Sequence, residues 1–120
     1  MLASVVVPGD GVGKTYGYPT ANLQMRRSQV PFTQGVYVAW ATMDRVRYEA
    51  ALIIQNEPWK VEVHLLDYHG PDFYGAFLSV DPIQKISEME SYDSEVELKE
   101  KILRDLELIK DFLRDWKDKK

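Results

Sequence analysis

The stretch GVYVAWATMDRVRYEAALII, residues 35–54, decides the fold of this chain. β-Branched and aromatic residues dominate its two ends, residues 35–42 and 47–54, and each end predicts a strand. The short connection Met43-Asp44-Arg45 between them is typical of a hairpin. Similar runs at residues 2–7, 61–68 and 73–80 predict further strands. Short strands at such close spacing favour an antiparallel barrel or sandwich over a parallel α/β sheet.

A single amphipathic helix is expected to follow the strands, over residues of about 94–118. Ser94 followed by Glu97 fits a capping box at its start. Apolar residues then recur three or four positions apart, which predicts one apolar stripe that packs against the sheet. A short coiled-coil dimer is the alternative use of this stripe. The stripe consists of Leu98, Ile102, Leu106, Ile109, Leu113 and Trp116.

Length and composition narrow the class of protein. The 120 residues suggest one domain, with a barrel over about 1–82, where all seven glycines and all six prolines lie. The net charge of −4 argues against a general nucleic-acid binder. The chain has no cysteine, so disulfides and thiolate chemistry are excluded. No apolar run reaches membrane-spanning length, and residues 1–7 do not resemble a signal peptide. We therefore expect a cytoplasmic monomer that binds neither nucleic acid nor membrane.

A glycine-rich segment at residues 9–17 invites comparison with a P-loop, but two features argue against one. The P-loop pattern needs glycine where Pro8 stands, and its final residues must open a helix. Gly17 and Pro19 make a helix at that point unfavourable. The remaining interpretations are a surface turn or a loop whose backbone amides approach a phosphate. We favour the phosphate loop, formed by Gly9, Gly11, Gly13, Lys14 and Gly17.

Directly after this loop, Pro19 stiffens the backbone before Thr20 and Asn22. In an extended segment, residues two apart project from the same face. A hydroxyl and a carboxamide on one face can together hold a hydrated Mg²⁺ and a phosphate oxygen. The alternative is that both side chains bond only to local backbone in a turn.

Glu62 is a carboxylate inside an apolar strand, Val61-Glu62-Val63-His64-Leu65-Leu66-Asp67. Strand alternation puts Glu62 and His64 on one face and the valines on the other. A carboxylate in such surroundings needs a partner or a function, and a general base is one such function. The alternative is an exposed pair on the outer face of a barrel. His64 is interpreted mainly as a packing or hydrogen-bonding group.

Taken in order, these segments resemble riboflavin kinases (flavokinases), including the kinase half of bacterial bifunctional FAD synthetases. The resemblance covers nearly the whole chain, and the Pro-Thr-Ala-Asn and Glu-Val-His pieces are its most specific parts. The matching segments are residues 9–23, Pro31 with Gly35-Val36-Tyr37, residues 61–67, Phe73-Tyr74-Gly75 and the stretch from Tyr92 to Asp105.

The resemblance implies a mainly β fold, a six-stranded antiparallel Greek-key barrel with a C-terminal α-helix. It also implies transfer of the γ-phosphate of ATP to the 5′-hydroxyl of riboflavin, which yields FMN and ADP. By position, Thr20 and Asn22 would bind Mg²⁺ and phosphate, and Glu62 would be the base. The glycine loop would cover the nucleotide phosphates. Tyr92 and Trp59 are the candidates for flavin contact.

Three departures from the family pattern support other hypotheses. Val12 and Ser87 stand where the family usually has arginine, and Gln55 lies in an altered segment whose following loop is shortened. These changes suggest, as an alternative, a catalytically impaired module that binds flavin or nucleotide as a regulatory or interaction protein. A related kinase that acts on another alcohol is a third hypothesis. None of these departures touches Thr20, Asn22 or Glu62.

Overall fold

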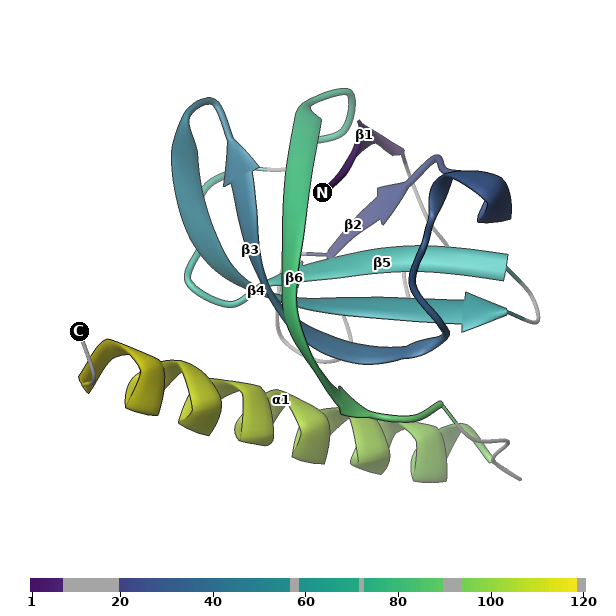
Figure 1. Cartoon of the computed structure of the whole chain (residues 1–120), viewed down its shortest axis with the longest axis vertical. Coiled ribbons are helices and arrows are strands. Elements are labelled where there is room, and N and C mark those ends of the chain that lie inside the picture. Colours follow the sequence, from purple (N-terminus) through teal and green to yellow (C-terminus); the bar gives the residue numbers. More distant parts are fainter. Residues whose placement is uncertain (8–19, 57–58, 72, 90–93, 119–120) are drawn as a thin grey trace.

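Six antiparallel strands close into a barrel, and one long helix lies across its outside (Figure 1). The structure is a computed structural model that describes residues 1–7, 20–56, 59–71, 73–89 and 94–118. Within these residues, the helices are η2 (Arg27–Gln29), a short 3-10 helix, and α1 (Glu95–Asp118). The strands are β1 (Leu2–Val7), β2 (Thr20–Leu23), β3 (Gly35–Met43), β4 (Val46–Asn56), β5 (Trp59–Leu65) and β6 (Phe77–Ser87).

The strand order around the barrel is β1-β2-β5-β4-β3-β6. Strands β3, β4 and β5 are neighbours both along the chain and in space, and the next strand, β6, returns to pair with β3. This return of one strand beside three consecutive ones is a Greek-key connection. The predicted fold, a six-stranded antiparallel barrel with a C-terminal helix, is confirmed.

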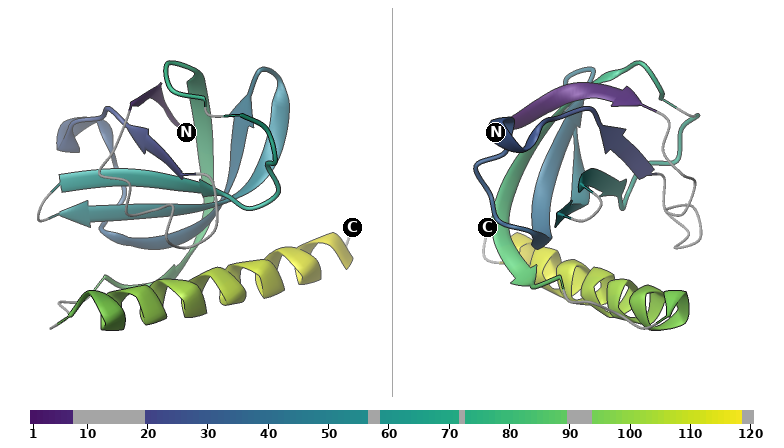
Figure 2. Two further views of the ribbon diagram at one scale, coloured as in Figure 1. Left: turned by 180° about the vertical axis from the view of Figure 1, so that it is seen from behind. Right: turned by 90° about the vertical axis from the view of Figure 1, so that its right-hand side faces the viewer.

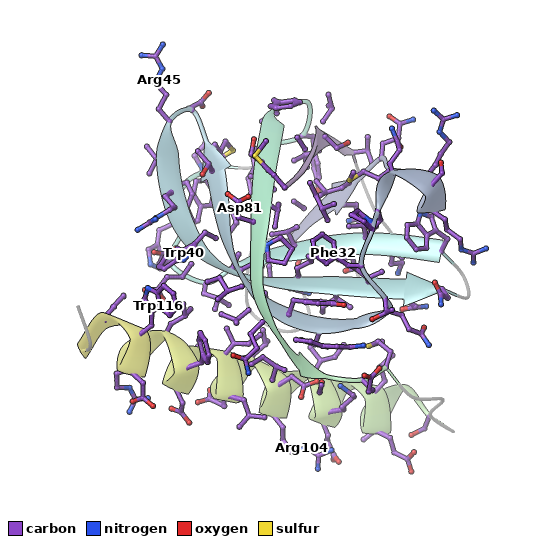
Figure 3. All side chains as sticks on the ribbon, viewed as in Figure 1. Phe32, Trp40, Arg45, Asp81, Arg104 and Trp116 are labelled. Atoms are coloured by element: carbon purple, nitrogen blue, oxygen red, sulfur yellow. The ribbon has the colours of Figure 1, made fainter. Side chains whose placement is uncertain are left out.

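The predicted hairpin joins β3 to β4 through a two-residue turn. Asp44 and Arg45 have φ angles of 51° and 69°, and positive φ at both central residues defines a type I′ turn. This turn suits the right-handed twist of the strands on either side. Arg45 projects from the tip of the hairpin, away from the barrel (Figure 3).

Two apolar layers hold the fold together, one inside the barrel and one between the barrel and α1. Alternate residues of β3 and β4 contribute to each layer, so both strands are apolar on both faces. The inner layer includes Tyr37, Leu52, Ile54, Val63, Leu65, Leu78 and Val80. The outer layer joins Val36, Val38 and Ile53 to Ile102, Leu106, Ile109 and Leu113 of the helix.

Helix α1 crosses the outer faces of β3, β4 and β6, and Figure 2 shows this from two further directions. The amide of Glu97 donates to Ser94 Oγ at 3.2 Å, which is one of the two hydrogen bonds of the predicted capping box. The four buried residues of the stripe each contribute about 1.5–3 kcal/mol through burial. Arg104 points from the helix away from the barrel (Figure 3). In the described ranges, no helix is long and apolar enough to cross a membrane.

Two strands differ at both ends from those predicted. The strand expected over residues 73–80 begins at Phe77 and extends to Ser87, through Pro82. Pro82 lies opposite Ala39, at a shift of the β3–β6 register, where the ladder tolerates a residue without an amide proton. The strand expected over residues 61–68 begins at Trp59 and ends at Leu65. Beyond it, Asp67 turns back and accepts a hydrogen bond from the amide of Glu49 at 3.0 Å.

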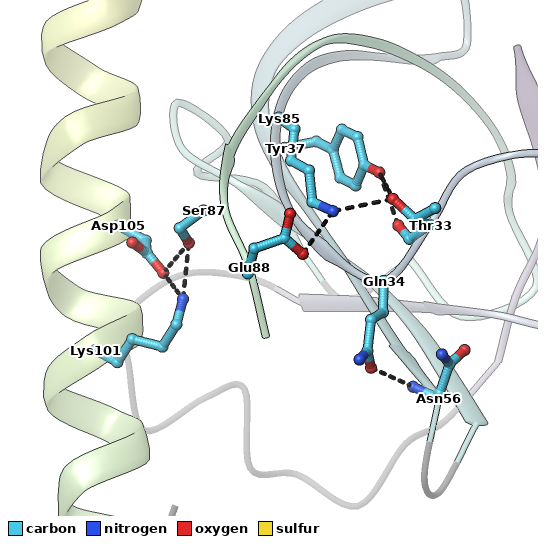
Figure 4. A network of polar contacts seen from close by, with 9 residues as sticks. All are labelled: Thr33, Gln34, Tyr37, Asn56, Lys85, Ser87, Glu88, Lys101 and Asp105. Atoms are coloured by element: carbon cyan, nitrogen blue, oxygen red, sulfur yellow. Dashed lines mark hydrogen bonds and ion pairs between the residues drawn. The ribbon is translucent and has the colours of Figure 1, made fainter. Parts of the chain in front are cut away.

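Two charged residues of the helix are buried, although charged residues on a surface helix usually face solvent. Lys101 and Asp105 are 7% and 4% exposed, and they form an ion pair. Ser87 at the end of β6 completes the cluster, since its Oγ lies 2.8 Å from Asp105 Oδ2 and 2.7 Å from Lys101 Nζ (Figure 4). The cluster fastens the end of β6 to the helix.

Candidate active site

The candidate site lies on the outer faces of β2 and β5, where these strands pair. In the ladder, Thr20 is opposite His64, and Asn22 is opposite Glu62. Directly opposed residues in an antiparallel pair share one face of the sheet. The alternating residues Ala21 and Leu23 are buried in the barrel interior, so these four polar residues occupy the other face. The expectation that Thr20 and Asn22 project together therefore agrees with the geometry.

Glu62 is 9% exposed and has a charged neighbour that sequence reasoning missed. Lys60 Nζ lies 3.4 Å from Glu62 Oε1, and the Lys60 side chain is itself only 24% exposed. Lys60 precedes Glu62 by two residues, which is the spacing that puts two side chains on one face of a strand. This spacing could have predicted from the sequence that Lys60 lies beside Glu62. The ion pair offsets part of the cost of burying the carboxylate.

His64 is fully buried, and its ring contacts Thr20 directly. The distance from Thr20 Oγ1 to His64 Nδ1 is 3.0 Å, which is a hydrogen bond that joins β2 to β5 through side chains. Burial lowers the pKa of His64 to about 4, because the charged imidazolium loses its hydration. At neutral pH the ring is therefore uncharged. The interpretation of His64 as a packing and hydrogen-bonding residue agrees with these contacts.

A small cavity of about 40 Å³ adjoins the site, between the outer face of the barrel and the first turns of α1. Its polar lining comes from Gln55, Lys60, Glu62 and His64, and Leu98 and Ile102 of the helix help to close it. A space of this size holds about one water molecule. A flavin or a nucleotide therefore cannot occupy it.

The oxygen donors of the site suit a hard cation. The Thr20 hydroxyl and the Asn22 carboxamide are oxygen ligands of the kind that Mg²⁺ accepts alongside substrate phosphates. Among the described residues, no group of three histidine, aspartate or glutamate side chains is arranged to hold a metal.

One further predicted site residue, Trp59, is described by the structure and is not brought to this face. Trp59 lies on the opposite face of β5 from Glu62 and packs against the inner apolar layer. Its Nε1 donates to the carbonyl of Met25 at 2.6 Å, and the Arg27 guanidinium lies 5.5 Å from the ring centroid. The remaining predicted residues, Gly9, Gly11, Gly13, Lys14, Gly17 and Tyr92, lie outside the described residues.

Residues 1–113 match the model of a protein family described as flavokinase, riboflavin kinase. The bifunctional riboflavin kinase/FMN adenylyltransferase of Escherichia coli K12 is 36% identical over 111 residues, which are 87% of this chain and 35% of that protein. The corresponding protein of Pseudomonas fluorescens is 34% identical over 112 residues, 88% of this chain and 35% of its own length. The chain thus spans about a third of the length of these curated relatives.

A solved structure of a riboflavin kinase has a similar fold. Riboflavin kinase from Trypanosoma brucei superposes with a TM-score of 0.67 at 26% identity, over 93% of this chain and 75% of that one. The closed six-stranded barrel with its C-terminal helix is the fold of a flavokinase-type domain. On the match of the family model to nearly its whole length, the chain belongs to the riboflavin kinase family.

Proposed function

We propose that this chain transfers the γ-phosphate of ATP to the 5′-hydroxyl of riboflavin, with FMN and ADP as products. One observation carries the proposal: Thr20 and Asn22 lie directly opposite His64 and Glu62 on one face of the closed barrel. A cation-binding pair and a carboxylate therefore face the same reactants. Phosphoryl transfer depends mostly on positioning and on charge neutralisation, so this small set of groups is sufficient.

In the proposed reaction, Glu62 accepts the proton of the ribityl 5′-hydroxyl. The alcohol oxygen forms a bond to the γ-phosphorus as the bond from that phosphorus to the β,γ-bridging oxygen breaks. ADP leaves with the bridging oxygen. Thr20 and Asn22 would hold Mg²⁺, which supplies positive charge to the phosphate oxygens when it is bound. The pairing of Glu62 with Lys60 keeps the carboxylate on this face before substrate arrives.

The roles of the other candidate site residues are proposals that rest on the family resemblance. The glycine loop with Lys14 would cover the phosphates, and Tyr92 would be the first candidate for contact with the flavin ring. Trp59 is a weaker candidate, because its indole is already engaged by Met25 and Arg27. The monomeric state and the cytoplasmic location also stay predictions.

The test is FMN formation from riboflavin by the purified chain with ATP and Mg²⁺, followed by chromatography. Glu62→Gln should lower the rate about 10²- to 10⁴-fold, because a general base is lost while shape is kept. Glu107→Gln, an identical change at a 72% exposed position of α1, is the matched control and should leave the rate unchanged. Unchanged turnover in Glu62→Gln would show that another group is the base.

A folded wild type that binds flavin or nucleotide tightly, yet makes no FMN with ATP, CTP or GTP, would contradict the kinase proposal. It would support the impaired binding module instead. Among the departures from the family pattern, Gln55 would then be the first to replace with the family's usual residue, because it lines the cavity beside Glu62. Turnover of another alcohol, with riboflavin inert, would support the third hypothesis.

A further inference from the structure

His64 and Thr20 form a side-chain bridge between β2 and β5, in addition to the backbone ladder. The two residues are directly opposed, and Nδ1 lies 3.0 Å from Oγ1. The imidazole has no exposed surface, whereas the Thr20 side chain is only partly buried. The buried ring is therefore fixed, and it holds a hydroxyl that faces the reactants.

The direction of this hydrogen bond decides what the hydroxyl can do. A threonine hydroxyl has one proton and two lone pairs, and a neutral imidazole has one nitrogen that donates and one that accepts. If Oγ1 donates to Nδ1, the lone pairs of the oxygen are directed away from the ring. If Nδ1 carries the proton, Nδ1 donates to Oγ1, and one lone pair of the oxygen is used in that bond. Only the first arrangement presents the oxygen fully as a ligand.

We propose that His64 is a positioning residue that accepts the Thr20 hydroxyl proton at Nδ1 and so aims the hydroxyl oxygen at the metal-bound phosphate. The inference rests on the proposed function, since it assigns Thr20 to that cation. Metal-binding groups in proteins are commonly oriented in this way by a second residue behind them.

The competing explanation is a buried histidine that only fills space and supports the β2–β5 pairing. Two amide substitutions separate the two roles. The Oδ1 of asparagine takes nearly the position of Nδ1, whereas the amide of glutamine reaches only the position of Nε2. His64→Asn therefore keeps an acceptor for Thr20, and His64→Gln removes it, although both remove the aromatic ring.

The first measurement is the tautomer of His64 in the ligand-free protein, by nitrogen-15 NMR of the ring. The proposal requires an unprotonated Nδ1 with the proton on Nε2, and Thr20→Val should shift the Nδ1 resonance. A proton on Nδ1 would overturn the proposal. This readout needs no activity, so it stands even if the chain makes no FMN and the proposed function fails.

The second measurement is the Mg²⁺ dependence of ADP binding, by calorimetry, with Mg²⁺ as the titrated variable. His64→Gln should raise the Mg²⁺ concentration needed for half-maximal binding about 10- to 100-fold, and His64→Asn should restore most of this loss. In a Thr20→Val background, His64→Gln should have no further effect. Equal losses in both His64 variants, in proportion to their loss of thermal stability, would show a packing role and overturn the proposal.

Discussion

Asn22 on β2 lies directly opposite Glu62 on β5, so an amide and a carboxylate share one face at the centre of the candidate site. Groups that serve one transition state do not act independently. Asn22→Ala is expected to lower kcat at least about 10-fold, since the proposed metal ligand is lost. The double variant with Glu62→Gln should lose clearly less, relative to Glu62→Gln alone, than Asn22→Ala loses relative to wild type. Steady-state FMN formation measures all four proteins.

A full multiplication of the two single effects would contradict this expectation. It would indicate that Asn22 acts on binding and Glu62 on a separate step. A useful control is Gln24→Ala, an exposed amide that lies just beyond the end of β2, which should leave kcat near that of wild type.

Mg²⁺ is expected to bind well only together with a nucleotide. Thr20 and Asn22 offer neutral oxygens, and the carboxylate on the same face, Glu62, is already paired with Lys60, so the site offers little net charge to hold a divalent ion. Mg²⁺ alone should therefore shift Tm by less than about 1 °C, whereas Mg²⁺ with ATP should raise it by several degrees through mass action. EDTA should abolish FMN formation without unfolding the protein. A large Tm shift with Mg²⁺ alone would show a metal site other than the one described.

The sequence predicted the architecture well because its strongest signals are periodic. The hairpin at residues 35–54 and the apolar stripe of α1 have enough length to show their periods, and both are confirmed. Strand β2 has only four residues, too few to show alternation, and only the family resemblance implied a sixth strand. Pro82 hid the second half of β6, since a proline normally argues against a strand.

The site was predictable in part. The spacing of Thr20 and Asn22, and that of Glu62 and His64, indicated which residues share a face within each strand. What the sequence could not show is the register between β2 and β5, because the two segments lie about forty residues apart. The contact of Thr20 with His64 depends on such long-range packing, and so does the contact of Ser87 with the Lys101–Asp105 pair. The pair itself is local, since its two residues are four apart on α1.

His64 should make the ligand-free protein less stable as the pH falls below neutrality. Its pKa is about 4 in the fold and near 6.5 when unfolded, so in this interval the unfolded chain binds the extra proton. Stability is therefore fully present above about pH 7 and declines by about 2 kcal/mol by pH 5. Lys60 and Glu62 are the charged residues that line the cavity beside the ring. Urea unfolding across this pH range, with EDTA present, measures the slope.

The matched variants for that slope are His64→Asn and His69→Asn. His64→Asn should flatten the profile between pH 7.5 and 5, whereas His69→Asn, at an exposed loop position, should leave it unchanged. A profile for His64→Asn as steep as that of wild type would place the responsible proton on another group.

Removing one charge of the buried Lys101–Asp105 pair should destabilise the protein more than removing both charges. Asp105→Ala leaves a buried ammonium without its carboxylate, which typically costs 3–5 kcal/mol, roughly, in unfolding free energy. The double variant Lys101→Met/Asp105→Leu removes both charges and keeps apolar volume, so it should lie closer to wild type than Asp105→Ala does. On the same helix, Glu107→Ala breaks an exposed pair with Lys110 and should cost less than about 1 kcal/mol. Denaturant unfolding of the four proteins measures the order of their unfolding free energies. A double variant less stable than Asp105→Ala would contradict this expectation. It would show that the charged pair, together with Ser87, is a net stabiliser of the contact between barrel and helix.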